Sequence, residues 1–277
     1  CIAMGGFLAA SAGAFRWDIF LLCSLTTVLL QILSNLANDY GDAVNGADHQ
    51  GRIGPARAVQ SGAISRNAMR RALILFVMLC LASGIALLWI SLEGNFETML
   101  YFFGLGVVSI LAAIAYTVGR KPYGYAGLGD FSVLVFFGIV GVLGSLYLFT
   151  KSIRWDHILP AMSCGFFSMG VLNINNIRDI ESDRQAGKFS VPVRIGRERA
   201  VIYHWILILS GLTSAIAYTF INFNSYFQWL FIVTIPLFLV NAASVNRKRA
   251  AELDPYLKQL AISTLAFVLL FGIGILL

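Results

Sequence analysis

Nine apolar stretches, separated by polar connections, dominate the hydrophobic pattern of this chain. They lie at roughly 1–15, 18–38, 72–91, 99–118, 127–149, 157–177, 200–221, 226–245 and 257–277. A helix needs about 20 apolar residues to cross a hydrocarbon core of roughly 30 Å, and each of the last eight stretches is long enough. The pattern therefore predicts an all-α, polytopic membrane protein with a nine-helix transmembrane bundle, in which residues 1–277 form a single domain. Because Cys1 opens a stretch that is already apolar, we interpret residues 1–15 as the end of a truncated first helix.

Composition and charge agree with this class and orient the predicted bundle. Hydrophobic residues make up 58% of the chain and charged residues 12%, whereas soluble domains carry about 25% charged residues. Seventeen of the 20 Lys and Arg residues fall in connections on one side, which the positive-inside rule makes cytoplasmic. The prediction is a multi-pass protein of the cell (inner) membrane. The net charge of +6 follows mostly from this topology, so we infer no nucleic-acid partner.

Polar residues gather where the apolar stretch before position 173 ends. If the helix continues through residues 173–188, Asn175, Asp179 and Asp183 are spaced i, i+4, i+8 and share one face. Glu181 then lies about 200° from Asp179 around the helix, and we expect it to face elsewhere.

A similar stretch ends the second apolar span, about 140 residues earlier. Asn35 and Asp39 repeat the Asn-x-x-x-Asp spacing, and Asp42 follows on the same face at i+3. Two polar helix ends of matching design indicate an internal repeat whose halves face each other at the cytoplasmic end. The alternative is that both stretches are water-facing helix caps.

If these helix ends meet, four carboxylates crowd one site. Two unit charges 5–6 Å apart repel by roughly 3 kcal/mol at an effective dielectric constant of about 20, so the groups need a cation or shifted pKa values. Carboxylate and amide oxygens without a nearby set of His or Cys ligands suit a hard ion such as Mg²⁺.

The cytoplasmic connections are longer and richer in Gly and basic residues than a plain linker. The connection from Asp39 to Arg71 contains Arg57, and the connection from Arg178 to Arg199 contains Lys188. Long connections of this kind are usually functional or disordered, and we interpret these two as partly helical caps over a polar cavity. Carboxylates and cations at the mouth of an apolar bundle fit a ligand with an anionic head and an apolar tail. The sequence contains no Gly-x-x-x-x-Gly-Lys-Ser/Thr motif, so a nucleotide ligand is not indicated.

Three stretches carry a resemblance to a known family, the UbiA-type intramembrane aromatic prenyltransferases. They also resemble, more narrowly, the branch of that family whose acceptor is 1,4-dihydroxy-2-naphthoate, in menaquinone synthesis. The stretches are Asn38-Asp-Tyr-Gly-Asp-Ala-Val-Asn-Gly-Ala-Asp48, Tyr116-Thr-Val-Gly-Arg-Lys-Pro-Tyr-Gly-Tyr-Ala-Gly-Leu-Gly-Asp130, and Asn175-Asn-Ile-Arg-Asp179 with Gly187-Lys188 and Val193-Arg-Ile-Gly196.

The resemblance implies a reaction and a role for individual residues. Mg²⁺ on Asp39, Asp42, Asp179 and Asp183 would hold an allylic polyprenyl diphosphate, and the ring of the naphthoate would attack the allylic cation. Lys121, Lys188 and Arg57 would stabilise the departing charge, and Tyr116 would support the cation or orient the acceptor. The residues expected to bind substrate are Asn35, Asn38, Arg57, Asn175, Asn176, Arg178 and Lys188.

The sequence departs from the family pattern at two points. Gly46 stands where the common pattern has a third Asp, and Asp48 follows two positions later, as in the naphthoate branch. The Arg-Pro of the family's first helix is missing from this chain.

Other functions and roles remain open at this stage. One alternative keeps the same family but changes the acceptor to 4-hydroxybenzoate or another aromatic ring. A transporter that binds a coupling ion is a further alternative, although the acidic residues lie near one membrane face and no broken helix pair is evident. An alternative interpretation of Lys121 is that it only follows the positive-inside rule, and an alternative interpretation of Tyr116 is that it only lies at the membrane interface.

Overall fold

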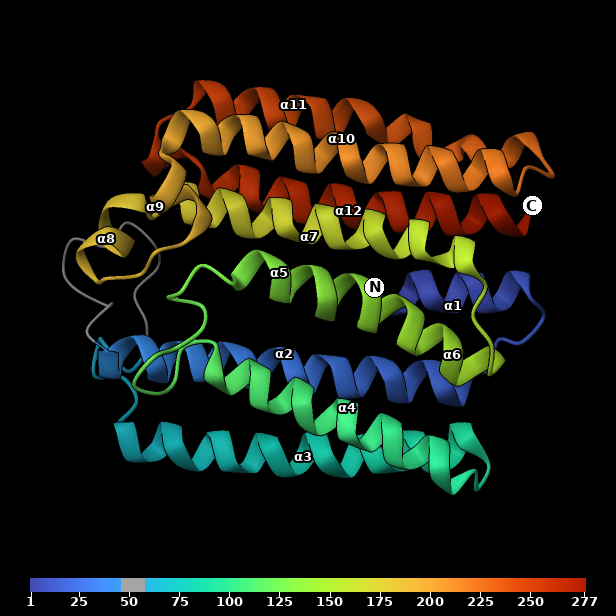
Figure 1. Cartoon of the computed structure of the whole chain (residues 1–277), viewed down its shortest axis with the longest axis horizontal. Coiled ribbons are helices and arrows are strands. Elements are labelled where there is room, and N and C mark those ends of the chain that lie inside the picture. The colour runs from blue at the N-terminus through green and yellow to red at the C-terminus, as the bar shows by residue number, and fades with distance from the viewer. Residues whose placement is uncertain (46–57) are drawn as a thin grey trace. The chain divides into compact units, whose positions relative to one another are not determined.

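A computed structural model describes residues 1–45 and 58–277, and all regular structure in these two ranges is helical (Figure 1). The α-helices are α1 (Ile2–Ser11), α2 (Trp17–Asn45), α3 (Arg66–Leu92), α4 (Phe96–Ala115), α5 (Gly129–Val133), α6 (Ser145–Thr150), α7 (Ile158–Arg178), α8 (Ile180–Gln185), α9 (Val191–Ile195), α10 (Arg197–Ile221), α11 (Ile235–Arg247) and α12 (Asp254–Leu276). The π-helix η1 (Leu134–Gly144) joins α5 to α6, and the 3₁₀-helices are η2 (Trp155–His157), η3 (Tyr226–Thr234) and η4 (Ala250–Glu252).

The predicted membrane spans are confirmed as helices. Within the described residues, eight helical segments are long and apolar enough to cross a membrane, and α1 is a shorter apolar helix. Three of the eight are composite, because α5, η1 and α6 run on as one segment, η2 leads into α7, and η3 leads into α11. The prediction that the connection after α7 is partly helical is also confirmed, by α8 and α9.

The chain folds as two compact units. Unit 1 contains Cys1–Arg16, Asp130–Ile180 and Val191–Leu277, and unit 2 contains Trp17–Gly129 and Glu181–Ser190. The boundary passes through the second acidic stretch, so Asp179 belongs to unit 1 and Asp183 to unit 2.

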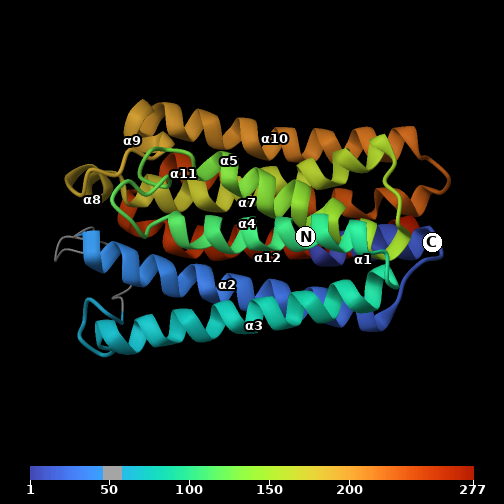
Figure 2. The ribbon, with the colours of Figure 1, turned by 60° about the horizontal axis from the view of Figure 1, so that its bottom comes forward.

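Unit 2 is built on α2, α3 and α4, which lie side by side in both views (Figures 1 and 2). Leu33, Cys80 and Ile110, one from each helix, form its buried core. Large apolar side chains such as Leu21 and Met78 point outward and are about three-fifths exposed. A membrane helix needs no polar outer face, because lipid surrounds it and its backbone hydrogen bonds are satisfied internally.

Unit 1 is built around α7, on a cluster of aromatic side chains. Phe167 stacks on Phe238 with ring centroids 4.3 Å apart and meets Phe267 edge-on at 5.1 Å. Such geometries add to the burial of the rings themselves. On another side of α7, a Cβ atom at Gly138 of η1 would lie 2.9 Å from the carbonyl oxygen of Ala161. Small residues of this kind let membrane helices approach closely.

Candidate active site

The end of α2 carries the first acidic stretch, and the helix continues to Asn45. Asp39 and Asp42 are therefore on one helical face, as predicted. The Asp39 carboxylate accepts backbone N–H groups of Ala58 at 3.1 Å and Val59 at 3.2 Å. Asp42 is only 4% exposed, and its Oδ1 accepts the hydroxyl of Tyr125 at 2.7 Å.

Thr117 fixes the same end of α2 from the side. Its hydroxyl donates to the Ala37 carbonyl oxygen at 3.0 Å and to Oδ1 of Asn38 at 3.1 Å. Its own carbonyl oxygen accepts the Asn45 side-chain amide at 2.8 Å. The close approach is possible because Gly41 faces Thr117, where a Cβ atom would lie 2.6 Å from the Thr117 carbonyl carbon and oxygen.

Gly41→Ala should therefore destabilise unit 2. We expect the added methyl group to lower the free energy of unfolding by about 1–3 kcal/mol, because the nearest atoms are backbone and cannot turn away. Denaturant titration of the protein in detergent micelles measures the change. The matched control is Gly84→Ala in α3, where the added Cβ meets nothing within 4 Å; equal destabilisation by both variants would contradict the assignment.

The segment that follows α7 meets α2 through Tyr125. Lys188 forms an ion pair with Asp183 at 3.2 Å, and both side chains are nearly buried. The next residue, Phe189, donates its backbone N–H to the Tyr125 carbonyl oxygen at 2.9 Å. Tyr125 thus contacts Asp42 with its side chain and the Asp183 segment with its backbone, all within unit 2.

The helix does not continue unbroken through the second acidic stretch, which was the condition for placing Asn175, Asp179 and Asp183 on one helical face. α7 ends at Arg178, and Asp179 has φ −98° and ψ 13° before α8 begins. Adjacent side chains on a continuous helix diverge by about 100°. Here Arg178 instead turns onto Asp179, and the break allows the two neighbours to pair.

Arg178 binds four acceptor atoms around the end of α7. Its Nε and Nη2 donate to the two carboxylate oxygens of Asp179, each at 2.7 Å, and Nη2 also donates to Oδ1 of Asn175 at 2.7 Å. Its Nη1 donates to Asp254 at the start of α12. The Arg178 side chain is about 5% exposed, so its contacts are within the protein. The predicted role of Arg178 in binding substrate directly stays a prediction.

Glu181 faces away from the site, as predicted, although the helix that orients it is α8 and not α7. Its side chain is 77% exposed and pairs with Arg184 at 3.3 Å. The Asp183 side chain, two residues on, is 10% exposed. Residues with the same charge in the same short helix therefore have opposite environments.

Two asparagines of α7 carry buried oxygen atoms that fit a hard cation or a hydrogen-bond donor. In the part of the chain that the structure describes, Oδ1 of Asn173 and Oδ1 of Asn176 accept no hydrogen bond, although the residues are 0% and 3% exposed. Buried polar atoms are nearly always paired, so such atoms point to an absent partner. Amide oxygens are acceptable ligands for Mg²⁺-type ions.

The remaining predicted residues have varied positions. Asn35 and Lys121 are exposed, and Tyr116 packs edge-on against Tyr123 at 5.4 Å. Arg57 lies outside the described residues, as does Asp48. Over 1–45 and 58–277, no three His, Cys, Asp or Glu side chains gather as a metal site. The gathering of four carboxylates therefore stays a prediction.

Three residues of the site were not predicted from the sequence. Tyr125 lies inside a quoted motif, but its hydroxyl partner is 83 residues away. Asn173 lies three residues before Asn176, outside the i, i+4 spacing of Asn175, Asp179 and Asp183 on which the prediction rested. Asp254 precedes a proline, and its partner Arg178 is 76 residues away in the sequence.

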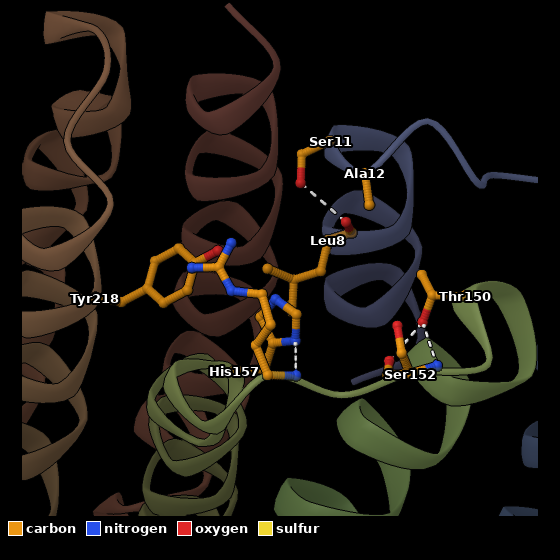
Figure 3. A pocket seen from close by; sticks show the side chains of 8 residues that line it. Leu8, Ser11, Ala12, Thr150, Ser152, His157 and Tyr218 are labelled. Atoms are coloured by element: carbon orange, nitrogen blue, oxygen red, sulfur yellow. Dashed lines mark hydrogen bonds between the residues drawn. The ribbon is translucent and has the colours of Figure 1, made fainter.

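The opposite end of α7 forms a separate polar cluster within unit 1. Arg154 pairs with the buried Asp156 at 2.8 Å, and Asn222 donates to the same carboxylate at 2.8 Å. A cavity of about 160 Å³ lies beside them; Figure 3 shows Tyr218 and His157 on its wall. It is smaller than the roughly 300 Å³ typical of small-molecule pockets and contains none of the predicted site residues.

Comparison with known proteins gives the family and its relatives. The model of the UbiA prenyltransferase family matches residues 1–275. A 1,4-dihydroxy-2-naphthoate octaprenyltransferase of Haemophilus influenzae is 46% identical over 268 residues, covering 96% of this chain and 87% of that protein. One of Escherichia coli is 45% identical over 275 residues, covering 99% and 89%. A solved UbiA homolog from Archaeoglobus fulgidus, bound to DMAPP and Mg²⁺, has a similar fold, with a TM-score of 0.66 at 17% identity over 100% of this chain and 94% of that one.

Proposed function

Because this chain belongs to the UbiA prenyltransferase family, we propose that it transfers a polyprenyl group from an allylic diphosphate to 1,4-dihydroxy-2-naphthoate. Diphosphate and CO₂ leave, and the product is demethylmenaquinol. Two relatives at 45–46% identity carry the name of this activity, and the chain covers most of their length. The observation in the structure that supports it best is the pair of buried carboxylates, Asp42 and Asp183, whose segments both contact Tyr125.

Mg²⁺ fits the residues proposed to hold it. Asp39, Asp42, Asp179 and Asp183 offer carboxylate oxygens, and Asn176 offers a buried amide oxygen without a hydrogen-bond partner among the described residues. All are hard oxygen ligands, which Mg²⁺ prefers. When bound, the ion would act as a Lewis acid on the diphosphate oxygens.

Cationic side chains of the protein stabilise the leaving diphosphate in the proposed reaction. We propose that Lys188, beside Asp183, and Lys121 neutralise the diphosphate as the allylic C–O bond breaks and its electron pair leaves with the diphosphate. The ring carbon that carries the carboxylate then forms the new C–C bond. Loss of CO₂ returns the electron pair of the broken C–C bond to the ring and restores its aromaticity, so no external base is needed at that carbon.

The membrane setting supports two further parts of the proposal. The chain is a multi-pass membrane protein, and an isoprenoid tail needs the apolar surroundings that membrane helices and lipid provide. The excess of Lys and Arg on the side of both acidic stretches supports an active site at the cytoplasmic face. The family match runs through segments of both units, which supports residues 1–277 acting as one domain.

Removal of divalent cations tests the proposal. Membranes that contain the protein, given a polyprenyl diphosphate and 1,4-dihydroxy-2-naphthoate, should lose activity on addition of EDTA and regain it with excess Mg²⁺. The reason is that the carboxylates repel the diphosphate when no cation neutralises them. Chromatography of the extracted quinol measures the product. Turnover that continues in EDTA would contradict the metal-dependent mechanism.

A further inference from the structure

We propose that Asp254, at the start of α12, is a positioning residue for the acidic site and acts on Asp179 through Arg178. This inference rests on the proposed function, in which Asp179 is a metal ligand. Asp254 lies 76 residues from Arg178 in the chain, and the two side chains form an ion pair within unit 1.

The geometry of Arg178 fixes the Asp179 carboxylate. The two N–H groups that reach Asp179 come from Nε and Nη2, so both carboxylate oxygens are held by one planar fork at 2.7 Å. Such a bidentate contact sets the plane of the carboxylate as well as its position. Each carboxylate oxygen has a second lone pair, which can face a metal ion while the first accepts from Arg178.

The position of the fork depends in turn on what holds Arg178. Asn175 accepts a second hydrogen bond from Nη2 at 2.7 Å, and Asp254 accepts from Nη1, on the other edge of the guanidinium. The Arg178 and Asp179 side chains are 5% and 4% exposed, whereas that of Asp254 is 44% exposed. Asp254 therefore links a buried pair to the protein surface.

Charge gives Asp254 a second effect on metal binding. Arg178 carries one positive charge, and the negative charge of Asp254 beside it offsets that charge. Without the Asp254 charge, the net charge next to the Asp179 oxygens is more positive, which disfavours binding of a metal cation there. Loss of the Asp254 contact to Arg178 and loss of the Asp254 charge thus both weaken metal binding.

Glu252 provides a matched control two residues earlier. It pairs with Arg249 at 3.3 Å and with Lys248 at 3.8 Å. Glu252→Gln removes the same charge from the same connection as Asp254→Asn, without altering the surroundings of Arg178.

Metal binding, measured apart from turnover, tests the proposal. Purified protein with an unreactive allylic thiodiphosphate is titrated with Mn²⁺, and free Mn²⁺ is followed by electron paramagnetic resonance. Asp254→Asn should raise the apparent Kd for Mn²⁺ by roughly 10- to 100-fold, the usual effect of losing a partner of a metal ligand. Asp254→Glu, which keeps the charge, should recover most of the affinity.

The remaining outcomes separate this inference from the proposed function. If Asp254→Asn and Glu252→Gln bind Mn²⁺ equally well, the positioning role is wrong. If Asp254→Asn does not fold, Arg178→Lys serves instead, because one ammonium cannot replace the fork; unchanged Mn²⁺ affinity in that variant would also overturn the role. If Asp179→Asn itself binds Mn²⁺ as wild type does, the proposed metal ligand is wrong, whatever Asp254 does.

Discussion

Asp39→Asn and Asp179→Asn should each reduce prenyl transfer by at least about 10²-fold, while Glu181→Gln should leave the rate close to that of wild type. Each Asp→Asn change removes a charge with little change in volume, so folding and membrane insertion should be retained. Removing one electrostatic contact to the reacting groups typically lowers the rate constant 10²- to 10³-fold. Asp179 is 3% exposed and held by Arg178, which leaves it no alternative orientation.

Glu181 makes this prediction specific. It lies two residues from Asp179 and two from Asp183, but its side chain is 77% exposed and pairs with Arg184 on the surface of α8. Initial rates in membranes with equal amounts of folded protein, checked by size-exclusion chromatography in detergent, give the comparison. An equal loss of activity in Glu181→Gln and Asp179→Asn would show that general charge, and not the position of the carboxylates, controls the reaction.

The membrane spans were predictable because hydropathy alone determines them. A stretch of about 20 apolar residues has few alternatives to a membrane helix, and the charged connections orient it. The shared face of Asp39 and Asp42 was also predictable, because α2 continues as one helix through both residues to Asn45.

The second acidic stretch was harder, because its conformation depends on contacts distant in sequence. Arg178 turns onto its neighbour Asp179 only where α7 stops, and its other carboxylate partner, Asp254, is 76 residues away. Periodicity cannot indicate such a break. It did separate Asp183 from Glu181 correctly, since two positions apart on any helix means nearly opposite faces.

The identity of the acceptor determines whether the acceptor's own carboxylate is lost as CO₂ or kept in the product. In the proposed reaction, the new bond forms at the ring carbon that bears the carboxyl group, and aromaticity returns only when CO₂ leaves. A 4-hydroxybenzoate prenyltransferase alkylates a ring position that carries hydrogen, loses a proton there and keeps the carboxylate. Each mole of prenylated naphthoquinol should therefore be accompanied by one mole of CO₂, whereas prenylated hydroxybenzoate releases none.

Carboxyl-labelled 1,4-dihydroxy-2-naphthoate tests this directly. Membranes that contain the protein, supplied with Mg²⁺, a polyprenyl diphosphate and the labelled acceptor, should release labelled CO₂ in step with an unlabelled prenylated quinol. Membranes with the Asp179→Asn variant should release neither above background. Prenylation of 4-hydroxybenzoate with its label retained, and no prenylation of the naphthoate, would contradict the proposed acceptor.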